Sequence, residues 1–167
     1  MFLGAAVVMG VASCGKTTVG EALAARLGAD FIEGDRLHPK ANIEKMSAGV
    51  PLTDDDRWPW LGLVGVSLTG PGGRVASCSA LKRAYREKIT IAAGRPVYFV
   101  FLDASREHLE LRIAARKNHF MPPSLLASQL AALQRPAPDE RAKAFDASLS
   151  VDEIVAQASA WLPQPME

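Results

Sequence analysis

The segment that most constrains this chain lies near its start, where residues 1–23 read MFLGAAVVMGVASCGKTTVGEAL. It contains Gly10-Val-Ala-Ser-Cys-Gly15-Lys16-Thr17, which has the spacing of a phosphate-binding loop. A continuous apolar run, residues 2–9, precedes this loop and is typical of a strand buried on both faces of a parallel sheet. Helical spacing of apolar residues follows it, from Thr17 up to Gly28. A strand, a glycine turn and a helix are the context that the motif requires.

The same segment allows a second interpretation, because Val11-Ala12-Ser13-Cys14 resembles the cleavage box of a bacterial lipoprotein signal. A secretory signal needs a positively charged region before its apolar core, and residues 2–15 contain no Lys or Arg. No apolar run reaches the roughly 18 to 20 residues that span a bilayer. We therefore favour the phosphate loop and expect a cytoplasmic protein with no membrane partner.

Composition bears on the number of domains, on nucleic-acid binding and on disulfide content. The 167 residues suffice for one domain, and we expect a single domain over residues 1–167. The net charge of +1 gives no broad electrostatic attraction to nucleic acid, so no nucleic-acid partner is expected. The two cysteines, Cys14 and Cys78, are too few for a disulfide scaffold and fit a reducing compartment, although one disulfide between them stays open.

Strand and helix patterns alternate along the chain, which predicts an α/β fold with a parallel sheet of about five strands and helices on both faces. This is the three-layer arrangement of P-loop nucleotide-binding proteins. We expect strands at residues 2–9, 30–32, 74–77, 96–102 and 143–149. We expect helices at residues 17–27, 39–49, 54–63, 79–93, 109–113 and 125–133, and a last one that follows a capping pattern at Ser150.

The loop predicts how a nucleotide is held. Backbone N–H groups and the positive end of the following helix converge on phosphate oxygens. Lys16 is expected to reach the β- and γ-phosphates, and the Thr17 hydroxyl to ligate Mg²⁺. A cysteine inside the loop can be activated by a helix terminus, but for Cys14 we favour a filling role. The residues expected to bind ATP here are Gly10, Ala12, Ser13, Cys14, Gly15, Lys16, Thr17 and Thr18.

Two carboxylates, Glu33 and Asp35, stand where the second strand should end. Ligands of open α/β sheets bind along the carboxyl edge of the strands. Beside a nucleotide, one carboxylate suits a contact to metal-bound water and the other a contact to an attacking hydroxyl. We expect Glu33 to serve the metal and Asp35 the hydroxyl; the alternative is that Asp35 caps a turn.

Four basic side chains are further candidates. His38 and Arg57 suit an acidic substrate, because a guanidinium can clamp a carboxylate with two hydrogen bonds, although each also fits an ordinary surface position. Arg112 and Arg116 are four residues apart and are expected to share one helix face. They precede an irregular segment, so they suit a lid that closes over ATP, at about residues 112–124; the alternative is a solvated basic face.

Several segments together resemble the gluconokinase family, in the shikimate and gluconate branch of small P-loop kinases. They are MGVASCGKTTVG, GDRLHPKANIEKMSAGVPLTDDDRWPWL, CSALKRAYR, ARKNHF, SQLAALQRP and DER, spread from Met9 to Arg141. The resemblance implies ATP-dependent phosphorylation of D-gluconate to 6-phospho-D-gluconate, with Mg²⁺, in sugar-acid catabolism. Shikimate kinase has the same general layout without the segment from His38 to Trp60, so a kinase of another small molecule is one alternative. A module that binds ATP without catalysis is a less favoured one.

The resemblance also implies roles for individual residues. Lys16, Asp35 and Arg116 would be catalytic, with Asp35 facing the sugar-acid hydroxyl, and Arg112 would bind the nucleotide. Arg112 and Arg116 resemble paired lid arginines, of which one packs on adenine and the other reaches phosphate. The residues expected to contact substrate are Asp35, His38, Arg57, Lys82, Arg83 and His119.

Two features depart from the family pattern. Glu33 replaces an Asp that is frequent there, which keeps the charge at this position but lengthens the side chain that would reach the metal. The stretch between Leu61 and Cys78 is short, with a Gly70-Pro-Gly-Gly73 turn that bears on the substrate pocket or on the surface of a possible homodimer.

Overall fold

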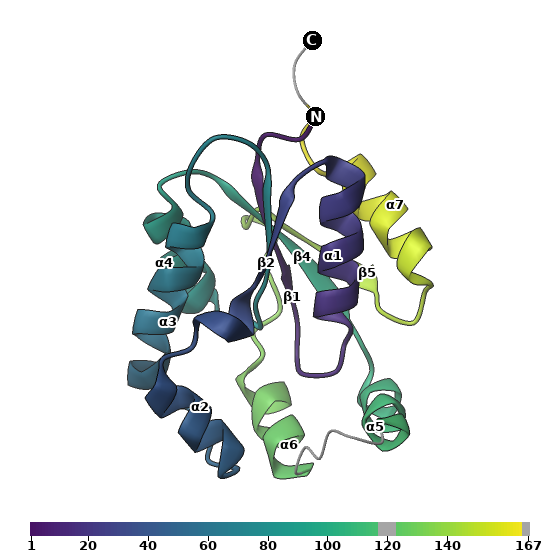
Figure 1. The fold of residues 1–167 in the computed structure, drawn as a ribbon. Coiled ribbons are helices and arrows are strands. Elements are labelled where there is room, and N and C mark those ends of the chain that lie inside the picture. Colours follow the sequence, from purple (N-terminus) through teal and green to yellow (C-terminus); the bar gives the residue numbers. More distant parts are fainter. Residues whose placement is uncertain (117–122, 165–167) are drawn as a thin grey trace.

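The computed structural model describes residues 1–116 and 123–164, and shows one five-stranded sheet in which every neighbouring pair is parallel (Figure 1). The strand order is β2-β3-β1-β4-β5. This confirms the predicted parallel α/β fold. The strands are β1 (Ala5–Met9), β2 (Asp30–Glu33), β3 (Arg74–Ser77), β4 (Val97–Asp103) and β5 (Ala142–Asp146).

The apolar run at the start of the chain forms the central strand. All five residues of β1 are buried, because β3 and β4 flank it and helices cover both faces. Small and β-branched side chains suit such a position, which has no solvent-facing side. The strand begins at Ala5 rather than at residue 2, and the Phe2 ring lies instead over Gly4, where a Cβ atom would come within 2.7 Å of it.

Helices form two outer layers (Figure 1). On one face, α1 (Lys16–Leu27) packs beside α7 (Val151–Trp161); on the other, α3 (Asp54–Ser67) packs beside α4 (Arg83–Ala93). Below the carboxyl ends of the strands lie α2 (Lys40–Ser47), α5 (Arg106–Ala115), α6 (Pro123–Ala132) and the short 3₁₀ helix η1 (Gly34–Leu37). None of the helices within the described residues has both the length and the apolar character needed to cross a membrane.

Capping boxes begin two of the helices, and the one at Ser150 confirms the predicted capping pattern. Thr53 and Asp56 form a reciprocal capping box at the start of α3, and Ser150 and Glu153 form another at the start of α7. Each box satisfies N–H groups that a helix terminus leaves without intrahelical partners. Their hydrogen bonds explain why both helices begin where the sequence pattern placed them.

The predicted helix at residues 79–93 is too long at its start. The segment after β3 forms a buried turn, in which Ala80 has a left-handed φ of 45°, and α4 begins only at Arg83. The predicted last strand is too long at its end, because the Asp146 carboxylate accepts hydrogen bonds from the N–H and hydroxyl groups of Ser148 and begins a turn.

The turn at residues 70–73 lies at the amino end of β3, whereas Ser77 at the other end of this strand reaches the predicted site. Arg95 donates a hydrogen bond to the Gly70 carbonyl at 2.9 Å and so holds the turn there. The turn itself therefore lies away from the predicted site, whereas the same short stretch reaches that site through Ser77. Its relation to a dimer surface stays a prediction.

Candidate active site

The phosphate loop joins the buried end of β1 to the start of α1. Three residues have positive φ: Gly10 at 148°, Ser13 at 66° and Gly15 at 99°. A Cβ atom on Gly10 would lie 2.7 Å from the Cys14 sulfur and 3.1 Å from the Leu102 carbonyl oxygen, so only glycine fits. Cys14 is buried behind the loop, which agrees with the filling role expected for it. The result is a tight loop that leads directly into the helix terminus that phosphate binding requires.

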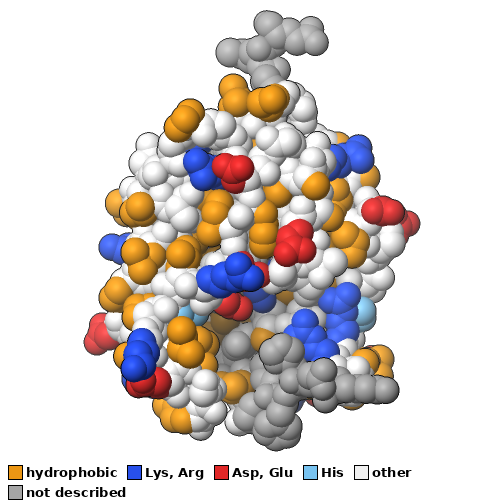
Figure 2. Space-filling model, viewed as in Figure 1, with side chains coloured by type: hydrophobic (Ala, Val, Ile, Leu, Met, Phe, Trp, Pro, Cys, Tyr) orange, Lys and Arg blue, Asp and Glu red, His pale blue; other side chains and the backbone are white. Residues whose placement is uncertain are grey.

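Three cations lie on this loop. The Lys16 ammonium donates to the Val11 carbonyl at 2.9 Å, which folds its side chain across the loop. The Arg112 guanidinium donates to the Ser13 carbonyl at 3.2 Å, and Arg116 to the Ser13 hydroxyl at 3.5 Å. Figure 2 shows Lys and Arg side chains grouped on this side of the molecule, between the ends of α1 and α5. The predicted pair of arginines therefore meets at the phosphate loop.

The prediction that Arg112 and Arg116 share one helix face was wrong. Helix α5 ends at Ala115, and Arg116 follows it with an extended backbone, so the two arginines do not share a helix face. They meet because the chain leaves the helix toward Ser13. Of the predicted lid, residues 117–122 lie outside the described part of the chain, and the His119 prediction falls among them.

Glu33 connects the ends of two strands with the start of α1. Its carboxylate accepts hydrogen bonds from the Thr17 hydroxyl and the Ser77 hydroxyl, each at 2.6 Å. Because Thr17 donates its proton to Glu33, the lone pairs of its oxygen remain available to a cation. A hydroxyl oxygen beside a carboxylate is a donor set that Mg²⁺ prefers when phosphates supply further oxygens, so these residues fit the predicted metal.

Gly34 separates the two predicted carboxylates, and it has no room for a side chain. A Cβ atom there would lie 1.9 Å from the Ser77 carbonyl oxygen. The Trp60 indole N–H donates to the Gly34 carbonyl at 2.8 Å, which ties α3 to this point. Glu33 is consequently held against the phosphate loop, while Asp35 follows in η1 and is exposed.

His38 is a buried histidine at the end of η1. Its ring stacks on Trp60 with 3.9 Å between the ring centroids, and only 8% of the residue is exposed. The Asn42 amide nitrogen donates to the Asp56 carbonyl at 2.9 Å and lies 3.2 Å from His38 Nδ1. An amide N–H facing Nδ1 places the imidazole proton on Nε2. Burial lowers the pKa of His38, Asp35 opposes this shift, and Arg57 adds to it.

A mixed cluster, called here the Asp54 cluster, contains Asp54, Arg57, Lys82 and Tyr85. The Tyr85 hydroxyl and the Lys82 ammonium, at 3.2 Å, donate hydrogen bonds to the Asp54 carboxylate. The Arg57 guanidinium forms an ion pair with it at 3.8 Å and donates to the Tyr85 hydroxyl at 3.2 Å. Both cations also lie over the Tyr85 ring, 5.5 Å and 5.6 Å from its centroid. The Tyr85 hydrogen bond, and then Lys82 and Arg57, lower the pKa of Asp54. The structure thus brings Arg57 and Lys82 together around one carboxylate.

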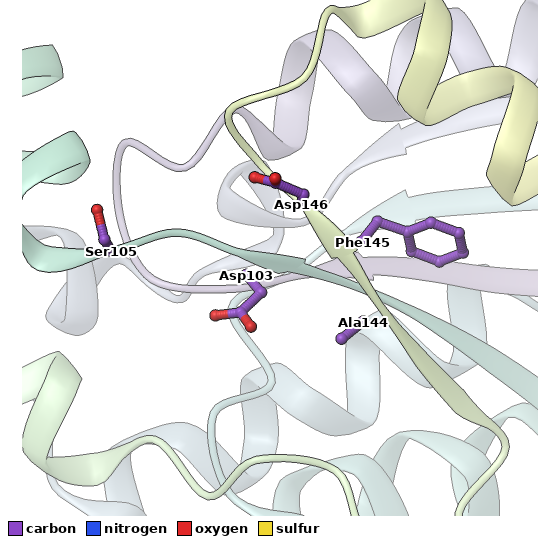
Figure 3. Close-up of a pocket in the computed structure, with 5 residues that line it drawn as sticks. All are labelled: Asp103, Ser105, Ala144, Phe145 and Asp146. Carbon is purple, nitrogen blue, oxygen red and sulfur yellow. The ribbon is translucent and has the colours of Figure 1, made fainter.

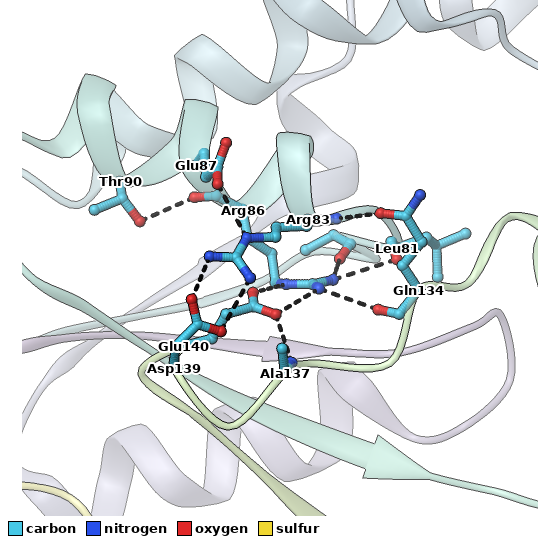
Figure 4. Close-up of polar contacts among 10 residues, drawn as sticks. Leu81, Arg83, Arg86, Glu87, Thr90, Gln134, Ala137, Asp139 and Glu140 are labelled. Atoms are coloured by element: carbon cyan, nitrogen blue, oxygen red, sulfur yellow. Dashed lines mark hydrogen bonds and ion pairs between the residues drawn. The ribbon is translucent and has the colours of Figure 1, made fainter.

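Arg83, which was predicted to contact the substrate together with Lys82, does not join the Asp54 cluster. It forms two hydrogen bonds with Asp139, at 3.0 Å and 2.7 Å, and another with Glu87 at 3.1 Å (Figure 4). In the described part of the chain, the Arg83 guanidinium therefore binds Asp139 and Glu87, which lie outside the Asp54 cluster.

Sequence reasoning assigned no role to Arg86, which braces the turn that carries Lys82. Its guanidinium forms two hydrogen bonds with Glu140, at 2.7 Å and 3.2 Å, and donates to the carbonyls of Ala80, Leu81 and Gln134 (Figure 4). Burial would raise the pKa of Glu140, but the bonds from Arg86 and the Ala137 N–H outweigh it and lower that pKa. Both residues stand in segments of the family resemblance, CSALKRAYR and DER, but no local spacing relates them, because they are 54 positions apart.

Gln129 was also missed. Its side-chain oxygen accepts a hydrogen bond from the Ala12 N–H at 2.7 Å and so brings α6 onto the phosphate loop. The two residues lie 117 positions apart. The segment SQLAALQRP belongs to the family resemblance, but nothing in its spacing points to the loop.

An open pocket of about 440 Å³ lies at the carboxyl ends of β4 and β5 (Figure 3). Its walls include Asp103, Ser105 and Asp146. Asp103, which follows the strand as a Walker B acid would, forms two hydrogen bonds with Arg135. The pocket shares the carboxyl edge of the sheet with the phosphate loop, because β4 is the neighbour of β1.

Known proteins resemble the chain along most of its length. A family model described as an AAA domain matches residues 6–136. The gluconokinase of Gluconobacter oxydans is 53% identical over 138 residues, which are 80% of this chain and 77% of the relative. A probable gluconokinase of Schizosaccharomyces pombe is 49% identical over 144 residues, 81% of this chain and 75% of the relative.

The chain belongs to the gluconokinase family. A crystal structure of a gluconokinase from Sinorhizobium meliloti agrees with this, with a TM-score of 0.88 and 51% identity over 95% of this chain and 90% of that one. The long sequence block that suggested gluconokinase, residues 34–61, forms η1, α2 and the first part of α3. It therefore supplies His38 and half of the Asp54 cluster.

Proposed function

We propose that the protein transfers the γ-phosphoryl group of ATP to the terminal hydroxyl of D-gluconate and forms 6-phospho-D-gluconate. The observation that carries this proposal is a meeting of two sites at one edge of the sheet. The phosphate loop lies at the end of β1, and donors that bind a carboxylate follow β3 and begin α3. A kinase for a sugar acid requires both.

The phosphate loop and its cations account for the nucleotide half of the reaction. Backbone N–H groups of the loop and the terminus of α1 bind the phosphates, and Lys16 swings from the Val11 carbonyl onto the β- and γ-phosphates. Arg112 and Arg116 approach from α5 and neutralise charge on the transferring group. Thr17 and Glu33 would hold Mg²⁺, which supplies further positive charge when it is bound. The pocket at the ends of β4 and β5 offers room for the base.

The second half of the site suits a hydroxylated acid. Asp35 is exposed at the carboxyl edge and accepts the proton of the attacking hydroxyl or orients it. His38, with its proton on Nε2, can donate a hydrogen bond to another substrate hydroxyl. Arg57 and Lys82 bind the substrate carboxylate, and their contacts to the Asp54 carboxylate support this role. Because the site stretches from the phosphate loop to the Asp54 cluster, an extended acid fits it.

Catalysis then depends on position and charge. In-line transfer needs the hydroxyl and the γ-phosphoryl held together, and the protein forms no covalent bond to either. Binding of both substrates should precede closure of the lid, because an open site would transfer phosphate to water.

A coupled assay of ADP release tests the proposal with D-gluconate, shikimate and nucleoside monophosphates as acceptors. We expect turnover with gluconate alone. Turnover of shikimate but not gluconate would overturn the choice of substrate. Binding of ATP without transfer to any sugar acid would favour a nucleotide-binding module that does not catalyse.

A further inference from the structure

Helix α6 places an uncharged amide on the phosphate loop. The Gln129 side-chain oxygen accepts the Ala12 N–H at 2.7 Å, and both groups are partly buried. Gln129 therefore lies beside the backbone N–H groups that bind phosphate in loops of this kind. It reaches this place from α6, the first described helix after residues 117–122.

The bond to Ala12 fixes which way the amide faces. A backbone N–H can only donate, so the side-chain atom that contacts the Ala12 N–H must be Oε1. Nε2 then occupies the other position of the Gln129 amide and is not the atom bound to Ala12. Among residues 1–116 and 123–164, no hydrogen bond from Gln129 Nε2 is found. Nε2, which carries two N–H bonds, is bonded to the same carbon as Oε1, the oxygen that contacts the loop. They are thus within reach of an anion bound there.

The other donors at the loop differ from this one. Lys16, Arg112 and Arg116 are long, charged and each bound to a loop oxygen that they must leave to reach phosphate. Gln129 is anchored to a loop N–H, so it needs no rearrangement to present its own donors. A donor that is fixed before the reaction stabilises developing charge at little cost of reorganisation.

We propose that Gln129 is a catalytic residue whose Nε2 donates a hydrogen bond to the γ-phosphoryl group of ATP while its oxygen holds the loop. This rests on the proposed function, because the group that is contacted is the one transferred. The amide exchanges no proton and forms no covalent bond. Its effect is to align the phosphoryl group and to stabilise its charge during transfer.

The variant Gln129→Glu separates the two halves of this amide. Glutamate keeps the size and the oxygen that accepts the Ala12 N–H but removes both donors. We expect kcat to fall about tenfold or more, as for loss of one preorganised donor. Binding of AMP-PNP, which carries a γ-phosphoryl group, should weaken more than binding of ADP.

Gln134→Glu is the matched control. The Gln134 oxygen accepts the Arg83 N–H at 2.9 Å, which is the same kind of contact at the start of a helix away from the loop. This variant should retain kcat within about twofold, since it leaves all donors to phosphate in place. Thermal melting of all variants shows whether the fold is retained.

Gln129→Met tests whether added charge alone explains the result, because methionine is uncharged and lacks the donors. It should also lower kcat. If Gln129→Glu has normal kcat, the residue only tethers the loop, and if Gln129→Met has normal kcat, the glutamate acts by repulsion; either result overturns the proposal. A wild-type protein that does not phosphorylate gluconate would instead refute the proposed function, and the AMP-PNP and ADP affinities would still test Gln129.

Discussion

The Lys16 ammonium lies against the Val11 carbonyl, within the loop that it is expected to serve. This one hydrogen bond adds little to the stability of the fold, because its loss leaves only a carbonyl that has a second lone pair. In transfer, by contrast, the same ammonium meets two phosphates. Its removal should therefore affect the reaction far more than the folded state.

We predict that Lys16→Ala lowers kcat/KM about tenfold or more, because a cation that stabilises the transferring group is lost. Steady-state kinetics with ATP and gluconate measure the loss, and thermal melting should show an unchanged fold. Lys40→Ala is the control, since the Lys40 side chain is 90% exposed and, within residues 1–116 and 123–164, pairs with Glu44 alone. Near-normal turnover of Lys16→Ala would remove Lys16 from its role.

Asp35→Asn should lower kcat while ATP binding largely survives. The amide keeps the size of the carboxylate but cannot accept the hydroxyl proton. Kinetics give kcat, and titration with ADP gives nucleotide affinity. Asp152→Asn, in the first turn of α7, should leave both unchanged. Equal turnover of Asp35→Asn and wild type would show that Asp35 is not the group that activates the hydroxyl.

The sequence predicted those site residues whose surroundings are local. Gly10, Lys16 and Thr17 stand in one loop, and the context of that loop is visible in the residues beside it. Gln129 and Arg86 could not be predicted in this way, because their partners lie 117 and 54 positions away. Their roles depend on how α6 and α4 pack, and no short pattern encodes that packing.

At the level of elements, the turn before α4 illustrates what holds the substrate half of the site. Residues 79–82 were predicted as helix, yet they form a turn whose carbonyls are bound by a guanidinium from α4 itself. The helical spacing of apolar residues in the sequence continues through this turn, because its apolar residues are buried as those of a helix would be. The sequence pattern therefore predicted helix there. The boundary is set by Arg86 and Glu140, and thus by tertiary contacts.

Glu140→Ala should destabilise the protein by about 3–5 kcal/mol, the usual cost of leaving one buried charge without its partner. Only 2% of the Arg86 side chain is exposed, so water cannot replace the carboxylate. Urea unfolding measures the change in the free energy of unfolding. Glu87→Ala is the control: its pair with Arg83 is exposed and should contribute less than about 1 kcal/mol. Equal losses in both variants would refute the bracing role.

Over the whole molecule, the strand order 2-3-1-4-5 brings residues from distant segments to one edge of the sheet. Alternating strands and helices predicted the parallel sheet, but not which strands are neighbours. That order places β3 beside β1, and so the Asp54 cluster on the same edge as the phosphate loop. It also places β4 on the other side of β1, where the pocket lined by Asp103 and Asp146 opens.

Stability of the whole fold should depend on pH through His38. Unfolding exposes the ring and returns its pKa to the ordinary value of 6.5 from the lower value that burial imposes. The unfolded chain therefore binds a proton first as the pH falls, so His38 contributes its full stability above pH 6.5 and loses it as the pH falls toward the lowered pKa.

Urea unfolding at pH 8 and pH 5.5 checks this prediction, with His38→Phe as the comparison, because phenylalanine retains the stack on Trp60 but cannot titrate. Wild type should lose more free energy of unfolding between the two pH values than the variant. The same loss in both proteins would show that His38 is not responsible.

The lack of room at Gly34 bears on how this site can diverge. A Cβ atom 1.9 Å from the Ser77 carbonyl oxygen forbids every other amino acid unless the backbone moves. The residue at position 33, which serves the cation, and the residue at position 35, which serves the phosphate acceptor, can then be substituted independently. Gly34 between them stays constant. Directed evolution toward a new sugar acid should accordingly recover many residues at positions 35, 38 and 57, and glycine alone at position 34.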